Sequence, residues 1–247
     1  MSKTLIIGAT SAIAEATARE WVKRNKTEAF ILVGRNDKKL EEIALDLKAR
    51  GAKNVFVYKA DLSDIEQVEH LIKKICSEHK DVDRVLIAHG TLPDQNEMSE
   101  NTGETIFHFM VNATSTIGIL NEIAKELSIK GSGQIGVITS VAGDRGRKSN
   151  YLYGSAKSAV STFADGLRLY LADKGVSVTI IKPGFVDTPM TANFKKGLLW
   201  AQPEKVAISI ANAMASKKSN VYIPGFWMPI MFIIKHIPDF IFKRLPL

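Results

Sequence analysis

The residues best suited to chemistry in this sequence are a tyrosine and a lysine four positions apart, Tyr153 and Lys157. On a helix these positions share one face, so the lysine ammonium can approach the tyrosine hydroxyl. A free tyrosine titrates near pH ~10, and a neighbouring cation favours the phenolate, which brings the group into the range of acid–base catalysis. Ser140 ends an apolar run thirteen residues before Tyr153, where its hydroxyl could hydrogen-bond a reacting oxygen. The three residues together predict proton transfer at a carbonyl or alcohol oxygen.

Asn112, in the helical segment before Ser140, is a candidate fourth member of this set, holding a water in the proton path. A tyrosine and a lysine on one helix are by themselves more often structural than catalytic. The hypothesis therefore depends on the segments around them.

The first apolar run ends in a small-residue turn that leads directly into a helical pattern. A strand, a turn and a helix N-terminus in this order direct backbone N–H groups and the positive helix end at a phosphate. The candidate pyrophosphate-binding residues are Gly8, Thr10, Ser11, Ala12 and Ile13. Only Gly8 remains of the usual three glycines, with Ala12 and Ala14 in the other places, so this segment alone is equally compatible with an ordinary turn.

The second apolar run ends in Gly34-Arg35, at the place where NAD-selective sites carry an acidic residue. A guanidinium suits a 2′-phosphate through charge-assisted, bidentate hydrogen bonds. The sequence therefore predicts NADP(H) as the cofactor, with NAD as the alternative. If Arg35 has no role in binding, it is a solvated loop residue. Asp61 and Leu62 follow the third run, where Asp61 either meets the adenine or caps the helix starting near Ser63 or Asp64.

Apolar runs alternate with helical patterns along most of the chain, which predicts a parallel sheet covered on both faces. The predicted strands are Thr4–Ile7, Ala29–Val33, Asn54–Tyr58, Asp83–Ala88, Gln134–Thr139, Ser177–Ile181 and Asn220–Ile223. The predicted helices are Ala12–Lys26, Lys38–Arg50, Ile65–Glu78, Ile106–Ile129, Tyr151–Asp173 and Pro203–Ala215. This order predicts an α/β fold of the doubly wound, Rossmann type with a seven-stranded parallel sheet. We expect one domain over residues 1–225, followed by an apolar, basic tail over 226–247.

In this order and spacing the motifs resemble the short-chain dehydrogenase/reductase family over nearly the whole chain. The resemblance implies an NAD(P)-dependent oxidoreductase with Ser140, Tyr153, Lys157 and Asn112 as catalytic residues. It adds Tyr153 and Lys157 to the cofactor-binding set, together with Gly90, Pro183, Gly184, Val186 and Thr188, the last lying against the nicotinamide carboxamide. A homodimer or homotetramer is implied in the same way.

The chain departs from the family pattern at Ile87-Ala88-His89-Gly90, where the family usually shows Asn-Asn-Ala-Gly. This difference bears on the adenine side of the cofactor site and not on the catalytic residues. His89 falls at the edge of the expected cofactor cleft, where we expect a structural role.

The bulk composition limits partners and compartment. The net charge is +7, and no run of cations interleaves with aromatic residues, so we expect no nucleic-acid partner. The histidines form no metal-ligand set, so we expect no metal. A single cysteine, Cys76, and a strand that begins at once predict a cytoplasmic protein without a leader.

Two further segments bear on the substrate. Arg145, Arg147 and Lys148 lie in the loop between Ser140 and Tyr153, where three cations would suit a phosphate or form a solvated loop. The tail 226–247 combines large apolar residues with Lys235, Lys243 and Arg244, and its prolines prevent one spanning helix. It is either a cover packed on the protein or a partner subunit, or a segment in peripheral contact with the inner face of a membrane.

The tail, Gly133-Gln134-Ile135 and the stretch Arg145–Tyr153 resemble one branch of the family, the reductases of 2-keto sugars on decaprenyl phosphate. This resemblance implies reduction of a ketone on a sugar linked to a polyprenyl phosphate. The alternatives are an enzyme for a small soluble alcohol or a 3-oxoacyl chain, and a non-catalytic dinucleotide sensor. The intact Ser140, Tyr153 and Lys157 set argues against the sensor.

Overall fold

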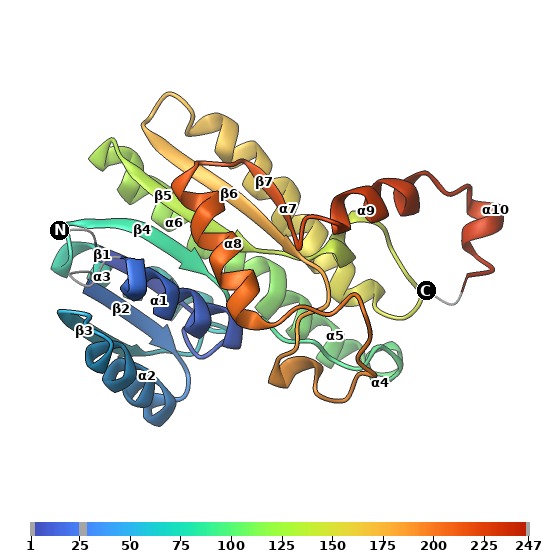
Figure 1. Cartoon of the computed structure of the whole chain (residues 1–247), viewed down its shortest axis with the longest axis horizontal. Helices are drawn as coiled ribbons and strands as arrows, with labels where there is room; N and C mark the ends of the chain where they lie inside the picture. Colours follow the sequence, from blue (N-terminus) through green and yellow to red (C-terminus); the bar gives the residue numbers. More distant parts are fainter. Residues whose placement is uncertain (1–2, 25–28, 246–247) are drawn as a thin grey trace.

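A single seven-stranded parallel sheet forms the centre of the molecule (Figure 1). The computed structural model describes residues 3–24 and 29–245. In these residues the strand order is β3-β2-β1-β4-β5-β6-β7, the doubly wound order that the sequence predicts. The strands are β1 (Lys3–Ile7), β2 (Ala29–Gly34), β3 (Asn54–Lys59), β4 (Val82–Ile87), β5 (Gly133–Ile138), β6 (Val176–Pro183) and β7 (Asn220–Ile223).

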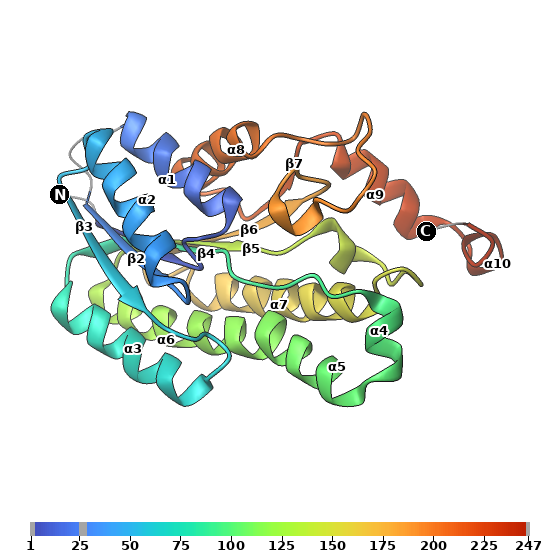
Figure 2. The same cartoon turned by 90° about the horizontal axis from the view of Figure 1, so that it is seen from below.

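Helices cover both faces of the sheet, which is why its inner strands are continuous apolar runs. Every residue of β2 is buried. Figure 2 shows α1 (Ala12–Arg24), α2 (Asp37–Ala49) and α8 (Pro203–Ala215) on one face, and α3 (Ile65–Glu78), α6 (Ser115–Lys130) and α7 (Tyr151–Tyr170) on the other. Each layer buries its own apolar cluster against the sheet. The predicted end of the first helix at Lys26 lies outside the described residues.

The predicted single helix Ile106–Ile129 is wrong at its beginning. The structure has α4 (Gln95–Glu100) and α5 (Thr102–Phe109), then one wide π turn (Met110–Thr114) that leads into α6. The N-cap of α5 is Asn101, whose side chain accepts a hydrogen bond from Glu104 N, so this helix begins four residues before the predicted start. Hydrophobic spacing does not distinguish an α turn from a π turn, and π turns often mark functional positions. Asn112 lies in this turn.

The tail forms two short helices, α9 (Trp227–His236) and α10 (Asp239–Phe242). Trp227 and Met231 of α9 are buried in a small apolar cluster with Val141, which follows β5. The opposite side of α9 exposes Met228, Phe232 and Ile233. Among the described residues no helix is long and apolar enough to cross a membrane.

Candidate functional site

The turn after β1 is shaped by Gly8, whose φ is +78°, in the region that favours glycine. A Cβ at this position would lie 2.5 Å from the backbone nitrogen of His89, at the end of β4. The backbone N–H groups of Gly8 and Ala9 both donate to Val33 O, each at 2.9 Å. The turn is thereby fixed against both neighbouring strands, and α1 begins at Ala12 directly behind it.

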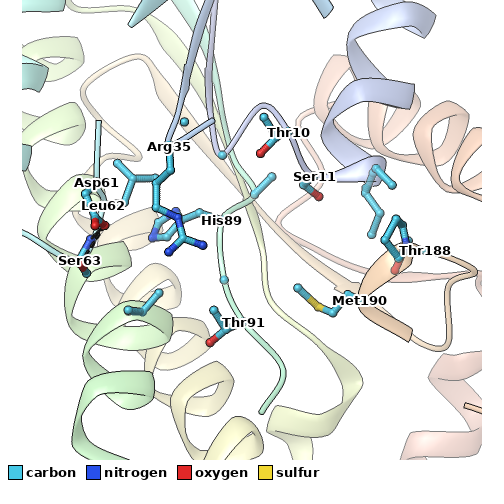
Figure 3. Close-up of a pocket in the computed structure, with 18 residues that line it drawn as sticks. Thr10, Ser11, Arg35, Asp61, Leu62, Ser63, His89, Thr91, Thr188 and Met190 are labelled. Carbon is cyan, nitrogen blue, oxygen red and sulfur yellow. Dashed lines mark hydrogen bonds between the residues drawn. The ribbon is translucent and has the colours of Figure 1, made fainter. Parts of the chain in front are cut away.

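A cavity of about 270 Å³ opens at this turn, along the carboxyl ends of β1, β2 and β4 (Figure 3). Of the residues expected to bind the cofactor, it is lined by Gly8, Thr10, Ser11, Ala12, Ile13, Arg35, Asp61, Leu62, Gly90 and Thr188. The lining residues that sequence reasoning missed are Gly34, Ser63, Ala88, Thr91, Val111, Pro189 and Met190. Most of these residues are next to a motif that the sequence analysis recognised, so their position could have identified them. Nothing in the sequence distinguishes Val111.

Arg35 is exposed, and Figure 3 shows its guanidinium pointing into the cavity, opposite Thr188 and Met190. Among the described residues no hydrogen bond or ion pair engages that guanidinium. Asp61 accepts hydrogen bonds from the N–H and hydroxyl of Ser63, at 3.0 and 2.8 Å, and these bonds lower the pKa of its carboxyl. The cap of α3 is Asp64, so Asp61 stands beside the cavity without capping the helix.

His89 lines the cavity, and its ring is directed at α6. Its Nε2 is 3.3 Å from Ser115 Oγ and 3.2 Å from Thr116 Oγ1, and its Nδ1 is buried without a hydrogen-bond partner among the described residues. Burial, then Lys157 and Arg35, lower the pKa of His89 to about 3. The imidazole is therefore neutral at physiological pH and holds the end of β4 to α6.

The structure brings together Ser140, Tyr153 and Lys157 at the carboxyl end of β5. Burial raises the pKa of Tyr153 to about 12, and a hydrogen bond with Ser140 acts in the opposite direction. The Lys157 ammonium lies 5.6 Å from the centre of the Tyr153 ring and donates to Ile138 O at 3.3 Å. Burial lowers the pKa of Lys157 to about 8. A buried lysine beside a buried phenol, each with a shifted pKa, is an arrangement that can take part in acid–base chemistry.

The side chain of Asn112 is hydrogen-bonded to Thr91 through both its oxygen and its nitrogen. Its Oδ1 accepts from Thr91 N at 2.8 Å, and its Nδ2 donates to Thr91 O and Thr91 Oγ1 at 3.0 and 3.1 Å. A Cβ on Gly90 would lie 2.7 Å from the Asn112 oxygen and 3.4 Å from the Lys157 nitrogen. Gly90 therefore lets the segment after β4 approach both side chains, and Asn112 holds that segment in place through Thr91.

Other expected cofactor residues lie at the end of β6 and in the segment after it. Thr188 reaches the cavity, whereas Pro183, Gly184 and Val186 lie outside its lining, as do Tyr153 and Lys157. Val186 forms a bridge with Ala201, and a Cβ on Gly184 would overlap the Trp227 indole. Glycine at 184 thus permits the first turn of α9 to pack on this loop.

A buried ionic cluster, not foreseen from the sequence, lies beneath the loop that follows Ser140. The Asp144 carboxylate accepts from Lys182 Nζ and from the Tyr222 hydroxyl, both at 2.6 Å. The side chains of Lys182 and Asp144 are only 10% and 3% exposed. Because Lys182 belongs to β6 and Tyr222 to β7, the cluster ties the serine loop to two strands.

The three loop cations expected to meet a substrate phosphate have different surroundings. Arg145 donates to Ile234 O and Ile237 O at 2.5 and 2.6 Å, pairs with Asp239 at 2.8 Å and stacks 3.7 Å from the Phe242 ring centre. Arg147 lies against Met231, and burial lowers the pKa of its guanidinium. Lys148 is exposed. Arg145 and Arg147 are therefore both engaged by the tail, and of the three loop cations Lys148 alone is exposed to a ligand.

Comparisons with known proteins identify the class. Residues 2–198 match the short chain dehydrogenase family. An uncharacterized oxidoreductase of Mycobacterium tuberculosis is 31% identical over 88% of this chain and 87% of its own length. A second, from Streptomyces coelicolor, is 31% identical over 98% of this chain and 94% of its own. The chain belongs to the short-chain dehydrogenase/reductase family.

Solved structures show the same fold. A structure of an actinorhodin polyketide ketoreductase with NADPH superposes with a TM-score of 0.78 at 21% identity, covering 90% of this chain and 95% of that one. A further short chain dehydrogenase/reductase family protein gives 0.77 at 23% identity, over 89% and 94%. The protein is thus an oxidoreductase with a nucleotide-binding Rossmann fold, of a family that uses NAD or NADP.

Proposed function

We propose that this protein is an NADP(H)-preferring reductase that converts a ketone to an alcohol, with Tyr153 as the proton donor. The observation that carries the proposal is the buried set of Ser140, Tyr153 and Lys157 at the sheet edge that also forms the cavity. A protein that only sensed a dinucleotide would have no need to bury an ammonium beside a phenol.

The residues fit the nicotinamide dinucleotide that the family uses. Gly8 shapes a turn that leaves no room for a Cβ, and the start of α1 behind it offers backbone N–H groups to a pyrophosphate. The exposed Arg35 guanidinium, pointing into the cavity, supports a preference for a 2′-phosphate. When bound, the nicotinamide supplies the hydride for reduction.

The chain's own residues then handle the proton. Because its pKa is raised to about 12, Tyr153 is a neutral phenol at physiological pH and can donate its proton to the developing alkoxide. The Ser140 hydroxyl hydrogen-bonds the same oxygen and polarises the carbonyl. The Lys157 ammonium stabilises the phenolate that is left, and Asn112 keeps Gly90 and Thr91 in place beside it. These assignments favour the reductive direction.

We propose a keto-sugar carried on a polyprenyl phosphate as the substrate. Lys148 is exposed in the loop between Ser140 and Tyr153 and is available for a phosphate, and the tail places large apolar side chains on the same side of the molecule. A small soluble ketone or a 3-oxoacyl chain is the alternative, in which the tail serves packing alone.

The test of the reaction is Tyr153→Phe, assayed with NADPH on a panel of simple ketones and 2-keto sugars. Loss of the proton donor should reduce turnover by roughly 10²- to 10⁴-fold while NADPH binding and the fold persist. Tyr151→Phe is the matched control, since Tyr151 is half exposed on the same helix and should stay active. Near-normal turnover by Tyr153→Phe would overturn the mechanism, and NADPH binding without reduction of any ketone would favour a sensor.

A further inference from the structure

Two separate segments at the carboxyl end of the sheet expose large apolar side chains beside cations. The first is the tail, where Phe232 and Ile233 are 66% and 64% exposed and Phe240 is exposed on α10. The second follows β6, where Leu198 projects fully into solvent and Phe194 is half exposed. Monomeric soluble proteins rarely leave such groups together on the surface without a partner to cover them.

A chain of aromatic contacts joins the bases of the two segments. The Phe185 ring stacks on Trp200 with centroids 5.3 Å apart and meets the edge of Trp227 at 5.4 Å. Trp227 in turn lies 5.9 Å from Phe226. The two segments are therefore held next to each other on one packed base, and Figure 2 shows α9 leaving the body at this end.

The net charge on these segments is positive, although Asp187 at the start of the second segment pairs with Lys196 at 2.6 Å. Lys235, Lys243 and Arg244 in the tail are exposed, and Lys195 adds a cation to the second segment. Asp239 is the only acidic residue from Phe226 to Leu245, and Arg145 neutralises it at 2.8 Å. Between Thr188 and Gln202 the sequence has no acidic residue.

We propose that these segments dock on an anionic phospholipid bilayer. Large apolar groups flanked by lysine and arginine are the composition of helices that lie in the membrane interface. With ten residues, α9 can lie in that plane but cannot span it. A second copy would bring the same cations against each other on a chain of net charge +7, whereas anionic headgroups are complementary to them.

Arg145 links this surface to the catalytic loop. It follows the 3₁₀ turn (Val141–Asp144) that starts after Ser140, and it caps the end of α9 through the carbonyls of Ile234 and Ile237. The docked surface would therefore face the bilayer beside the reacting groups. A lipid-anchored ketone could then reach the site from the membrane, an extension that rests on the proposed function; docking itself does not.

The test is flotation of the full-length protein, without cofactor or substrate, with vesicles of phosphatidylcholine or of phosphatidylcholine mixed with phosphatidylglycerol. Binding is expected only to the anionic vesicles, and it should weaken as NaCl rises. Lys243→Ala with Arg244→Ala should reduce binding by roughly thirtyfold, from about 1 kcal/mol for each basic residue. Ile233→Asp should abolish it.

Leu45→Asp on α2 is the matched control, because Leu45 is 65% exposed, close to the 64% of Ile233, and α2 lies at the other end of the molecule (Figure 1). It should bind as the wild type does, and both variants should keep the wild-type melting temperature. Equally weak binding to both vesicle types, or equal losses in the two aspartate variants, would overturn the proposal. Dissociation of an oligomer by Ile233→Asp would identify a second copy as the partner instead. Reduction of soluble ketones, measured separately, should be unchanged in Ile233→Asp, so failure of docking and failure of the proposed reaction are distinguishable.

Discussion

Replacing Lys157 by methionine is expected to stabilise the fold at neutral pH and to remove part of the pH dependence of its stability. The Lys157 side chain is buried, and burial lowers the pKa of its ammonium from 10.5 to about 8. In the unfolded chain this lysine titrates at its ordinary value, about 10.4. At pH values between these two pKa values the unfolded chain binds more protons than the folded one. The free energy of unfolding therefore rises with pH across this window.

The magnitude follows from the size of the shift. Each pKa unit corresponds to ~1.36 kcal/mol, so the free energy of unfolding rises by roughly 3 kcal/mol across the whole window. Of this rise, about 2 kcal/mol falls between about pH 7.5 and pH 9.5. Methionine has no ammonium to bury, but it loses the hydrogen bond that Lys157 donates to Ile138 O. That bond contributes about 1 kcal/mol. Lys157→Met should therefore unfold with a free energy roughly 2 kcal/mol above that of the wild type at neutral pH.

The assay is urea unfolding of both proteins near pH 7.5 and pH 9.5. Burial also raises the pKa of Cys76 to about 11 and that of Tyr153 to about 12, but these titrations occur in both proteins and largely cancel in the difference. Lys48→Met, at an exposed position of α2, is the control and should follow the wild type at both pH values. A gap between wild type and Lys157→Met that is the same at both pH values would refute the reasoning. A more stable but inactive Lys157→Met would show that the ammonium is kept for function.

Two other predictions concern the cofactor and the ionic cluster. Arg35→Ala should weaken NADPH binding about ten- to a hundredfold in a calorimetric titration and leave NADH nearly unchanged, since a charge-assisted hydrogen bond contributes roughly 1.5–3 kcal/mol; equal losses for both nucleotides would show that Arg35 does not read the phosphate. Lys182→Met should lower the free energy of unfolding by roughly 3–5 kcal/mol because it leaves the Asp144 carboxylate buried without its cation. In urea unfolding the Lys182→Met, Asp144→Asn double variant should recover part of that loss, and a single-variant loss below about 1 kcal/mol would contradict a buried pair.

Much of the fold could be predicted because its signals are local. The bounds of α3, α8 and β7 agree with the predicted ranges, and the order of strands and helices predicts the doubly wound sheet. The errors fall where local pattern carries no information. The π turn at Asn112 has the same apolar spacing as an α turn, so the sequence predicts one continuous helix there.

The sequence by itself determined the class of chemistry, since Tyr153 and Lys157 share a helix face through their spacing and Ser140 follows a strand. It also determined the turn after β1, because Gly8 stands where a strand passes into a helix. Only the tertiary structure decided which cations remain open to a ligand. Arg145 finds its carbonyl acceptors 89 and 92 residues away in the tail, and Asp144 finds Lys182 and Tyr222 on two strands. Such partners are chosen by how the packed chain brings distant segments together, and neither residue type nor spacing along the sequence encodes that choice.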